Sequence, residues 1–173
     1  MPRLFTGLEI PSLQSSCLQL VQGGVQGMRW IDPADFHLTL RFIGDVSPGL
    51  ANDIVDALTR KTDAKPWKAP TIRFSELSAF GAKKPTSVYA GVVNTPELAS
   101  LHASQERLMQ RLGLPVDSRR FTPHVTIGRC RNVKAEGVAR FLSMAGPLFA
   151  EPFVPTRFVL YSAKESTGGG PYR

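Results

Sequence analysis

Hydrophobic residues follow two spacings along this chain, and the change from one to the other separates predicted strands from predicted helices. Alternating or continuous apolar positions are typical of strands, which bury one or both faces. Glycine, proline and polar residues separate these runs, and Gly81-Ala82-Lys83-Lys84-Pro85 joins two of them in a hairpin-like pair. The predicted strands are Leu4–Ile10, Phe36–Ile43, Thr71–Phe80, Ser87–Val93, Phe121–Gly128 and Phe153–Ser162.

Apolar positions three or four residues apart predict helices between these strands. A side chain able to cap a helix precedes or begins several of them, and proline then occupies the first turn. The predicted helices run from Ser12 to Gly23-Gly24, from Ser47-Pro48 through Leu58, from Thr95-Pro96 to Gly113, and over Ala135–Met144. Strands interleaved with helices, with no low-complexity segment or linker, predict one α+β or α/β domain over residues 1–173.

Composition narrows the class of protein. Hydrophobic residues make up 42% of the chain and charged residues 20%, which is a globular balance and excludes a disordered chain. The two cysteines, Cys17 and Cys130, lack the spacing of metal or redox motifs, so we expect free thiols in a reducing compartment. The start has no signal-peptide core and no later run has the length of a membrane span, so we expect a cytoplasmic protein.

The charge balance favours a polyanionic partner. The net charge is +7 and the isoelectric point lies near 9.9. Basic residues cluster at Lys83-Lys84, Arg119-Arg120 and Arg129-Arg131. These clusters either follow an RNA backbone or form solvated loops, and their arrangement around one groove would decide between the two interpretations.

A repeated motif is the most informative feature of the sequence. Phe36-His37-Leu38-Thr39-Leu40 returns as Pro123-His124-Val125-Thr126-Ile127, 87 residues further on. Side chains two apart on a strand share a face, so His37 lies beside Thr39 and His124 beside Thr126. The repeat predicts two similar halves related by a pseudo-twofold axis, with two imidazoles and two hydroxyls brought together.

Such a constellation suits phosphoryl chemistry without a metal. Imidazole titrates near about 6.5, so at neutral pH one ring can accept a proton from water while the other donates one to a leaving oxygen. Threonine hydroxyls can donate hydrogen bonds to the phosphate oxygens that gain charge. The third histidine, His102, has no threonine two residues on, and we expect it on a helix surface or in packing.

Together these motifs resemble the two-histidine phosphoesterase superfamily, and within it the RNA 2′,3′-cyclic phosphodiesterases once called 2′-5′ RNA ligases. The resemblance covers nearly the whole chain in order. It rests on Arg3-Leu4-Phe5, Glu9-Ile10-Pro11, Phe36 to Gly44, Phe121 to Arg129, Leu160-Tyr161-Ser162 and Gly169-Gly170-Pro171-Tyr172. The chain ends at Arg173, earlier than many relatives, and carries Gly128 where relatives often have a second apolar residue or a small one before the arginine.

The resemblance implies a bilobal α+β fold, with a pair of antiparallel sheets lining a central groove and helices outside. It implies hydrolysis of the 2′,3′-cyclic phosphate at an RNA 3′ end to a 2′-phosphate, with His37 as proton donor and His124 as proton acceptor. Thr39 and Thr126 would hold the phosphate. The residues alone do not assign the two proton-transfer roles, because the motifs are nearly identical.

Further site residues follow from position on the strands. Arg129 matches an arginine that the family uses near the phosphate, but by strand alternation it reaches the groove only if the strand ends or bulges at Gly128. Arg41 shares a face with His37 and Thr39, and lies either at the groove rim or on a solvent-facing strand surface. Phe5 and Tyr172 are candidates for stacking on a terminal base.

Expected partners are RNA 3′ ends or cyclic nucleotides. No carboxylate cluster, metal-type Cys/His spacing or glycine-rich nucleotide loop occurs, so we expect no metal and no cofactor. A monomer is expected. Two alternatives stay open: 2′-5′ joining of RNA by the reverse reaction, and a non-catalytic RNA-binding module.

Overall fold

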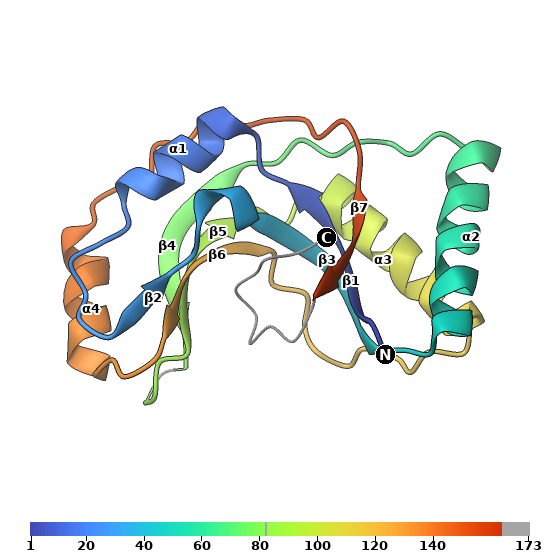
Figure 1. The fold of residues 1–173 in the computed structure, drawn as a ribbon. Coiled ribbons are helices and arrows are strands. Elements are labelled where there is room, and N and C mark those ends of the chain that lie inside the picture. The colour runs from blue at the N-terminus through green and yellow to red at the C-terminus, as the bar shows by residue number, and fades with distance from the viewer. Residues whose placement is uncertain (82, 164–173) are drawn as a thin grey trace.

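The computed structural model describes residues 1–81 and 83–163, which form an α+β fold around one antiparallel sheet (Figure 1). The sheet order is β4-β5-β6-β3-β1-β7, and β2 pairs with β6 beside this path. The strands are β1 (Arg3–Glu9), β2 (Met28–Trp30), β3 (His37–Asp45), β4 (Phe74–Phe80), β5 (Ser87–Val92), β6 (His124–Cys130) and β7 (Val159–Ala163). The helices are α1 (Ser12–Leu20), the short 3-10 helix η1 (Pro33–Asp35), α2 (Pro48–Ala64), α3 (Pro96–Arg111) and α4 (Ala135–Met144).

The two halves of the sheet meet between β3 and β6. Their paired residues are Leu38 and Val125, and both side chains are completely buried. On either side of this point the two strands pair with other partners, β1 with β3 and β5 with β6. The described strands thus form one continuous sheet with a narrow junction, rather than the pair of sheets that the resemblance implied.

Helix α1 follows β1 but packs on the half of the sheet that contains β5 and β6, and α3 follows β5 but packs on the half that contains β1 and β3. Figure 1 shows α1 beside α4 at one end of the molecule, and α2 with α3 at the other. Leu18 of α1 lies in a buried cluster with Val88 of β5 and Val125 of β6. Met109 of α3 lies in a second cluster with Leu4 of β1. Each half of the sheet is therefore covered by one helix from its own half of the chain, α2 or α4, together with one from the other half, α3 or α1.

Capping explains where two of the helices begin. The Ser47 hydroxyl accepts a hydrogen bond from the Leu50 amide at 3.2 Å, and the Thr95 hydroxyl accepts one from the Leu98 amide at 3.2 Å. The predicted cap at Thr95 is confirmed, and so is the predicted start of a helix at Ser47-Pro48. The prediction that Ser12 caps α1 was wrong. Ser12 is the first helical residue, Pro11 precedes it, and no side chain caps this end of the helix.

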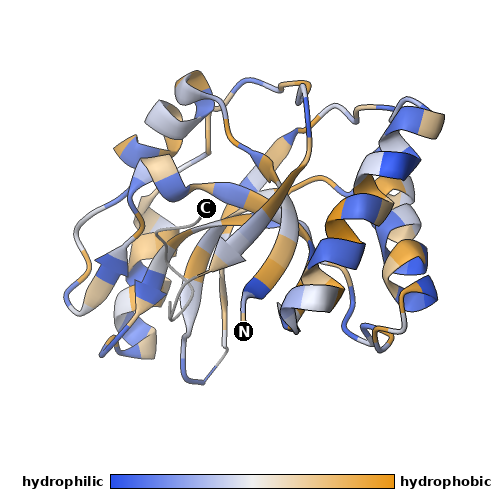
Figure 2. Ribbon diagram, turned by 45° about the vertical axis from the view of Figure 1, so that its right-hand side comes forward, coloured by the Kyte–Doolittle hydropathy of each residue, from blue (hydrophilic) through white to orange (hydrophobic). Residues whose placement is uncertain are grey.

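Hydrophobic and hydrophilic residues alternate along the helices and strands (Figure 2), as expected for elements with one buried face. Strand β2 was not predicted, because its three residues are too few to show a period. The last predicted strand was too long: β7 begins at Val159, and Phe153 instead forms an isolated bridge with Ile72. Among the described helices, none has the length and apolar content to cross a membrane.

Candidate active site

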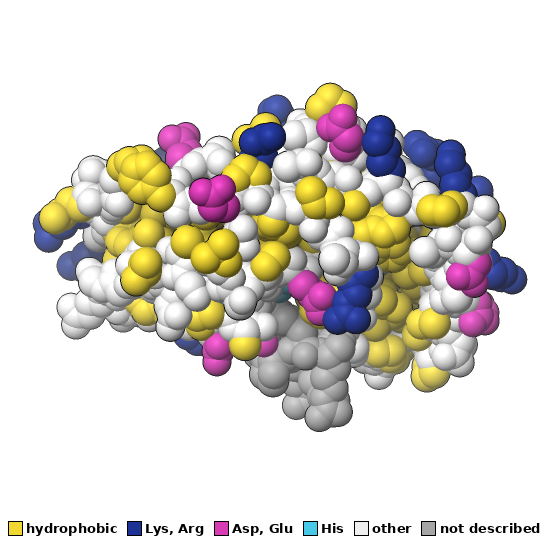
Figure 3. Space-filling model, turned by 90° about the horizontal axis from the view of Figure 1, so that it is seen from above, with side chains coloured by type: hydrophobic (Ala, Val, Ile, Leu, Met, Phe, Trp, Pro, Cys, Tyr) yellow, Lys and Arg dark blue, Asp and Glu magenta, His cyan; other side chains and the backbone are white. Residues whose placement is uncertain are grey.

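His37 and His124 occupy the first positions of the two strands that join the halves of the sheet. Because the antiparallel strands meet at Leu38 and Val125, the register places His37 beside Thr126 and Thr39 beside His124. All four of these polar side chains are partly exposed, whereas the residues between them are buried. The predicted constellation of two imidazoles and two hydroxyls thus lies on one face of the sheet. When the molecule is seen from above, relative to the view of Figure 1, almost no histidine surface is visible (Figure 3).

Both imidazoles are oriented in the same way by the backbone. Nδ1 of His37 lies 2.9 Å from the Asp35 carbonyl oxygen, and Nδ1 of His124 lies 2.6 Å from the Thr122 carbonyl oxygen. A carbonyl can only accept, so each Nδ1 must carry the hydrogen. In the neutral ring Nε2 is then the unprotonated nitrogen, available to accept a proton.

Aromatic rings enclose each imidazole from the neighbouring strand and from the edge strand. His37 has Phe5 of β1 at 4.9 Å and Tyr161 of β7 at 5.5 Å between ring centroids. His124 has Tyr89 of β5 at 5.1 Å and Phe80 of β4 at 4.9 Å. Of these four rings, the sequence analysis named only Phe5 as a candidate site residue.

Burial and charge lower the pKa of both histidines. Loss of solvent is the largest cause for each ring, and the positive charge of Arg129 lowers both pKa values further. His124 also lowers the pKa of His37, which indicates that the two rings are near enough to repel when charged. The carbonyl partners act in the opposite direction. The lowered pKa values favour the neutral form of both rings at neutral pH.

A bulge in β6 brings Arg129 to this face. Tyr89 of β5 pairs with Thr126, and Val88, which precedes it, pairs with Gly128. Ile127 therefore has no partner residue on β5 and is the extra residue of the bulge. The extra residue shifts the alternation by one. Arg129 pairs with Ser87, which shares a face with Tyr89, so the arginine lies on the face of His124 and Thr126. The bulge that the sequence analysis required is therefore present, one residue earlier than expected.

A matching bulge in β3 turns Arg41 to the opposite face of the sheet, away from the site. Gly7 pairs with Thr39 and Thr6 with Arg41, so Leu40 is the extra residue. Arg41 is 5% exposed, forms an ion pair with Glu106 of α3, and donates to the Pro115 carbonyl at 2.7 Å. The prediction that Arg41 lies on the exposed face with His37 is wrong, because strand alternation does not hold across the bulge.

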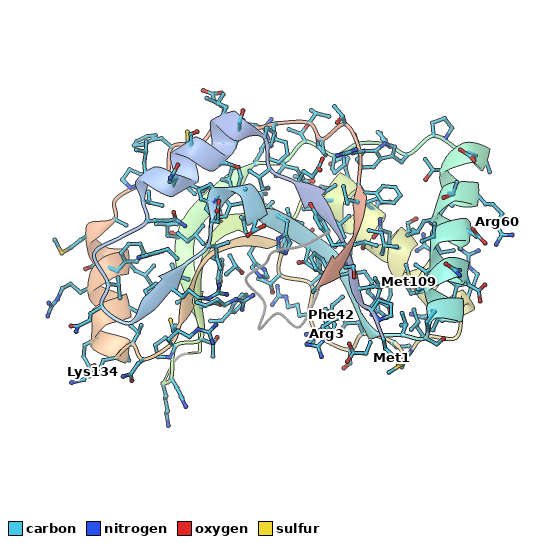
Figure 4. All side chains as sticks on the ribbon, in the orientation of Figure 1. Met1, Arg3, Phe42, Arg60, Met109 and Lys134 are labelled. Carbon is cyan, nitrogen blue, oxygen red and sulfur yellow. The ribbon has the colours of Figure 1, made fainter. Side chains whose placement is uncertain are left out.

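Phe42 takes the place on this face that alternation had assigned to Arg41. It pairs with Phe5 and is 42% exposed. Figure 4 shows it beneath the sheet near the end of β3. The Arg119 guanidinium lies 5.7 Å from the centre of its ring and is held by Asp117 at 3.1 Å.

The remaining predicted residues have mixed outcomes. Phe5 is buried and stacks on Tyr161, so its observed role is to pack beside His37. Tyr172 lies outside the described residues. His102 packs against Phe121 and contacts the Leu40 carbonyl at 2.8 Å, which confirms the packing interpretation. Over residues 1–81 and 83–163, no three His, Cys, Asp or Glu side chains converge as metal ligands.

Comparison with known proteins places these motifs in a family. The family model of the 2'-5' RNA ligase superfamily matches residues 29–167. An RNA 2',3'-cyclic phosphodiesterase of Geobacillus stearothermophilus is 33% identical over 114 residues, covering 65% of this chain and 34% of that protein. One of Aeropyrum pernix is 31% identical over 116 residues, covering 62% of this chain and 60% of that protein. One of Archaeoglobus fulgidus is 29% identical over 138 residues, covering 78% and 76%. The chain thus spans less than two thirds of the first two relatives.

Solved structures share the fold. TT0787 of Thermus thermophilus superposes with a TM-score of 0.80 at 21% identity, over 99% of this chain and 93% of that one. E. coli LigT without ligand gives a TM-score of 0.76 at 18% identity, over 99% and 93%. The complex of LigT with 3'-AMP gives 0.75 at 20% identity, over 100% and 95%. The architecture described above is therefore that of LigT.

Proposed function

Because the chain belongs to the 2'-5' RNA ligase superfamily, as its motifs predicted, we propose that it is a phosphodiesterase that opens the 2′,3′-cyclic phosphate at RNA 3′ ends. The names of its relatives support this substrate. The observation that carries the proposal is the pair of imidazoles, each held at Nδ1 by a carbonyl on one face of the sheet.

The reaction requires one proton acceptor and one proton donor. Nε2 of His124 takes a proton from water as its oxygen attacks phosphorus, and Nε2 of His37 gives a proton to the 3′ oxygen as the P–O3′ bond breaks. The product is a free 3′ hydroxyl and a 2′-phosphate. This assignment of roles follows the resemblance, since the two rings have matching backbone bonds.

The substrate itself supplies the charge that His37 needs. Burial and Arg129 lower the pKa of His37 in the free protein. A cyclic phosphate anion beside the ring favours the imidazolium form and so raises this pKa when substrate binds. The carbonyl of Asp35 accepts from Nδ1 in both protonation states, so the ring keeps its orientation while the proton on Nε2 moves.

Thr39, Thr126 and Arg129 bind the phosphate oxygens in this proposal. The register sets each threonine beside the histidine of the other motif, where a hydroxyl can donate to a non-bridging oxygen. Arg129 lowers the pKa of both imidazoles, so its positive charge acts on the space between them. A pentacovalent phosphate with growing negative charge would be stabilised there.

We also propose that the fold consists of two lobes related by a pseudo-twofold axis, within a single domain. The element order supports this: β1-α1-β3-α2-β4 corresponds to β5-α3-β6-α4-β7. The sheet order β4-β5-β6-β3-β1-β7 reads the same from either end under this correspondence. The matching bulges at Leu40 and Ile127 support it further.

The proposal is tested with an oligonucleotide ending in a 2′,3′-cyclic phosphate, incubated with the protein in EDTA, with separation of 2′- from 3′-phosphate products. We expect a 2′-phosphate from the wild type and losses of about 10²-fold or more in His37→Ala and His124→Ala. Absence of turnover in the wild type, or turnover that survives both substitutions, would refute the proposal. Retained RNA affinity without any turnover would favour the non-catalytic binding module.

A further inference from the structure

Arg29 lies directly beside Arg129 on the face that carries the motif side chains. Strand β2 pairs with β6 so that Arg29 is opposite Arg129 and Trp30 is opposite Gly128. A side chain at Gly128 would collide with Met28 and Trp30, at 2.8 and 3.0 Å, so those two residues lie on the opposite face. Arg29, between them in sequence, therefore projects to the face of Arg129.

The Arg29 side chain is only partly satisfied by the protein. Its Nε is buried and has no hydrogen-bond partner among residues 1–81 and 83–163, and the ion pairs between these residues do not include this arginine. The charge of Arg29 lowers the pKa of the Asp35 carboxyl, which burial and Asp32 raise. A buried donor without a partner is costly. The two outer nitrogens of Arg29 are not enclosed and form no hydrogen bond with the described residues, so they can donate to a bound anion.

Two arginines side by side also repel each other. Residues directly opposite on paired strands have Cβ atoms about 5 Å apart, and like charges in such pairs are destabilising. An anion bound between or beside the guanidinium groups relieves this repulsion. Phosphate suits the planar, forked arrangement of arginine donors.

Arg29 does not serve the reacting phosphate itself. The charge that lowers the pKa of both His37 and His124 is that of Arg129, whereas the charge of Arg29 acts on Asp35. By strand register Arg29 lies level with Arg129, three positions along β6 from Thr126 and at the end of that strand away from His124. An anion at this point would be the next phosphate along the same substrate.

We propose that Arg29 forms a subsite for the phosphate on the 5′ side of the terminal nucleotide. The inference rests on the proposed function and makes it more specific. The substrate class is then an RNA end, or a nucleotide that carries a 5′-phosphate, rather than a 2′,3′-cyclic nucleoside monophosphate alone. The chain selects this class by one additional charged contact.

The kinetic experiment compares three substrates that differ in the 5′ group: adenosine 2′,3′-cyclic phosphate, its 5′-phosphorylated form, and a dinucleotide ending in the same cyclic phosphate. For Arg29→Gln we expect kcat/KM to fall about tenfold or more on the two substrates with a 5′ phosphate, mainly through KM, and to stay within about twofold on the first. Arg29→Lys, which keeps the charge, should recover part of the difference.

Arg60→Gln is the matched control, since Arg60 is an exposed arginine of α2, on the outer side of the molecule far from β2 (Figure 4). This variant should leave all three substrates unchanged. An Arg29→Gln protein that is equally impaired on all three, or on none, would overturn the subsite.

A binding measurement separates this inference from the proposed function. The probes are adenosine 2′-phosphate and adenosine 2′,5′-bisphosphate, titrated calorimetrically into wild type and Arg29→Gln. Tighter binding of the bisphosphate that is lost in the variant supports the subsite even if no cyclic phosphate is hydrolysed. Equal affinity of the wild type for both probes would refute it even if hydrolysis is observed.

Discussion

Phe42 and Arg129 hold the same register position in the two motif strands. Each follows its motif threonine by three residues, and each comes after a bulge that turns it to the face of the histidines. One side of the site therefore presents a half-exposed phenyl ring and the other a guanidinium. The two halves of an otherwise matching site differ most at this position.

The first prediction follows from the charge of Arg129. Because this charge lowers the pKa of both imidazoles, Arg129→Gln should raise the pKa of His37 and His124 together. The measurement is NMR titration of the imidazole protons. Phe42→Leu, at the matching position, should leave both pKa values unchanged. A shift of one histidine without the other would contradict the position assigned to Arg129.

The proton-transfer roles can be separated by the leaving group. Bis(4-nitrophenyl) phosphate releases a phenolate that needs little protonation, so loss of the acid costs little on this substrate. We expect His37→Ala to retain most of the wild-type rate on it, while His124→Ala loses about 10²-fold. The opposite pattern would exchange the acid and base assignments. Equal losses in both variants would count against separate roles.

The lowered histidine pKa values also predict how stability depends on pH. In the unfolded chain both rings bind protons near pH 6.5, whereas in the folded protein they bind them at lower pH. Between these values the unfolded state holds more protons, so the free energy of unfolding falls as the solution is acidified from above pH 6.5 through the folded pKa values. The slope is at most about 1.4 kcal/mol per pH unit for each proton.

Urea unfolding of wild type and of a His37→Gln, His124→Gln double variant at several pH values measures this dependence. The variant should lack the part of the slope below pH 6.5 that the two rings contribute. A wild-type slope of the same size in the variant would show that other groups cause it.

Removing Arg41 should affect stability rather than substrate binding. Glu106 would stay partly buried with bonds from the Gln110 amide and the Asp117 N–H, both at 3.0 Å, but without its cationic partner. We expect Arg41→Gln to lower the free energy of unfolding by about 3 kcal/mol, with KM changed less than about twofold. Arg3→Gln, which breaks an exposed ion pair with Asp45, should change the stability far less, because solvent screens this pair. A large rise in KM without loss of stability would indicate that Arg41 contacts the substrate after all.

Gly128 is expected to tolerate no side chain. A Cβ there would lie 2.8 Å from the Met28 sulfur and 3.0 Å from the Trp30 ring. Gly128→Ala should therefore destabilise the protein by about 1–3 kcal/mol in thermal or urea unfolding. Gly137→Ala, within α4, is the control. Its Cβ would lie 3.8 Å from Val133, which precedes the helix, and alanine should stabilise the helix by about 0.5–1 kcal/mol. Equal effects of the two substitutions would contradict the packing of β2 against β6.

Much of the fold could be read from the spacing of apolar residues and from caps such as Thr95, because these are local signals. The repeated His-x-Thr pairs were equally visible, and the structure sets them side by side. The bulges could not be read, since an extra residue such as Leu40 or Ile127 is defined by the partner strand. For that reason Arg41 was placed on the wrong face, and the position of Arg129 was left open. Arg29 was missed because β2 is too short to predict.

The exchange of α1 and α3 between the two halves has a consequence for how the chain can be made. A fragment ending after β4 would keep α2 but lack α3, which completes the buried cluster around Leu4 with Leu108 and Met109, and the remaining fragment would lack α1, which carries Leu18. Neither fragment would be soluble as a native-like monomer, whereas the two mixed together have complementary surfaces and should recover the fold as a non-covalent heterodimer. In the intact chain, the first half must wait on the ribosome for α3 to emerge before its own core can close.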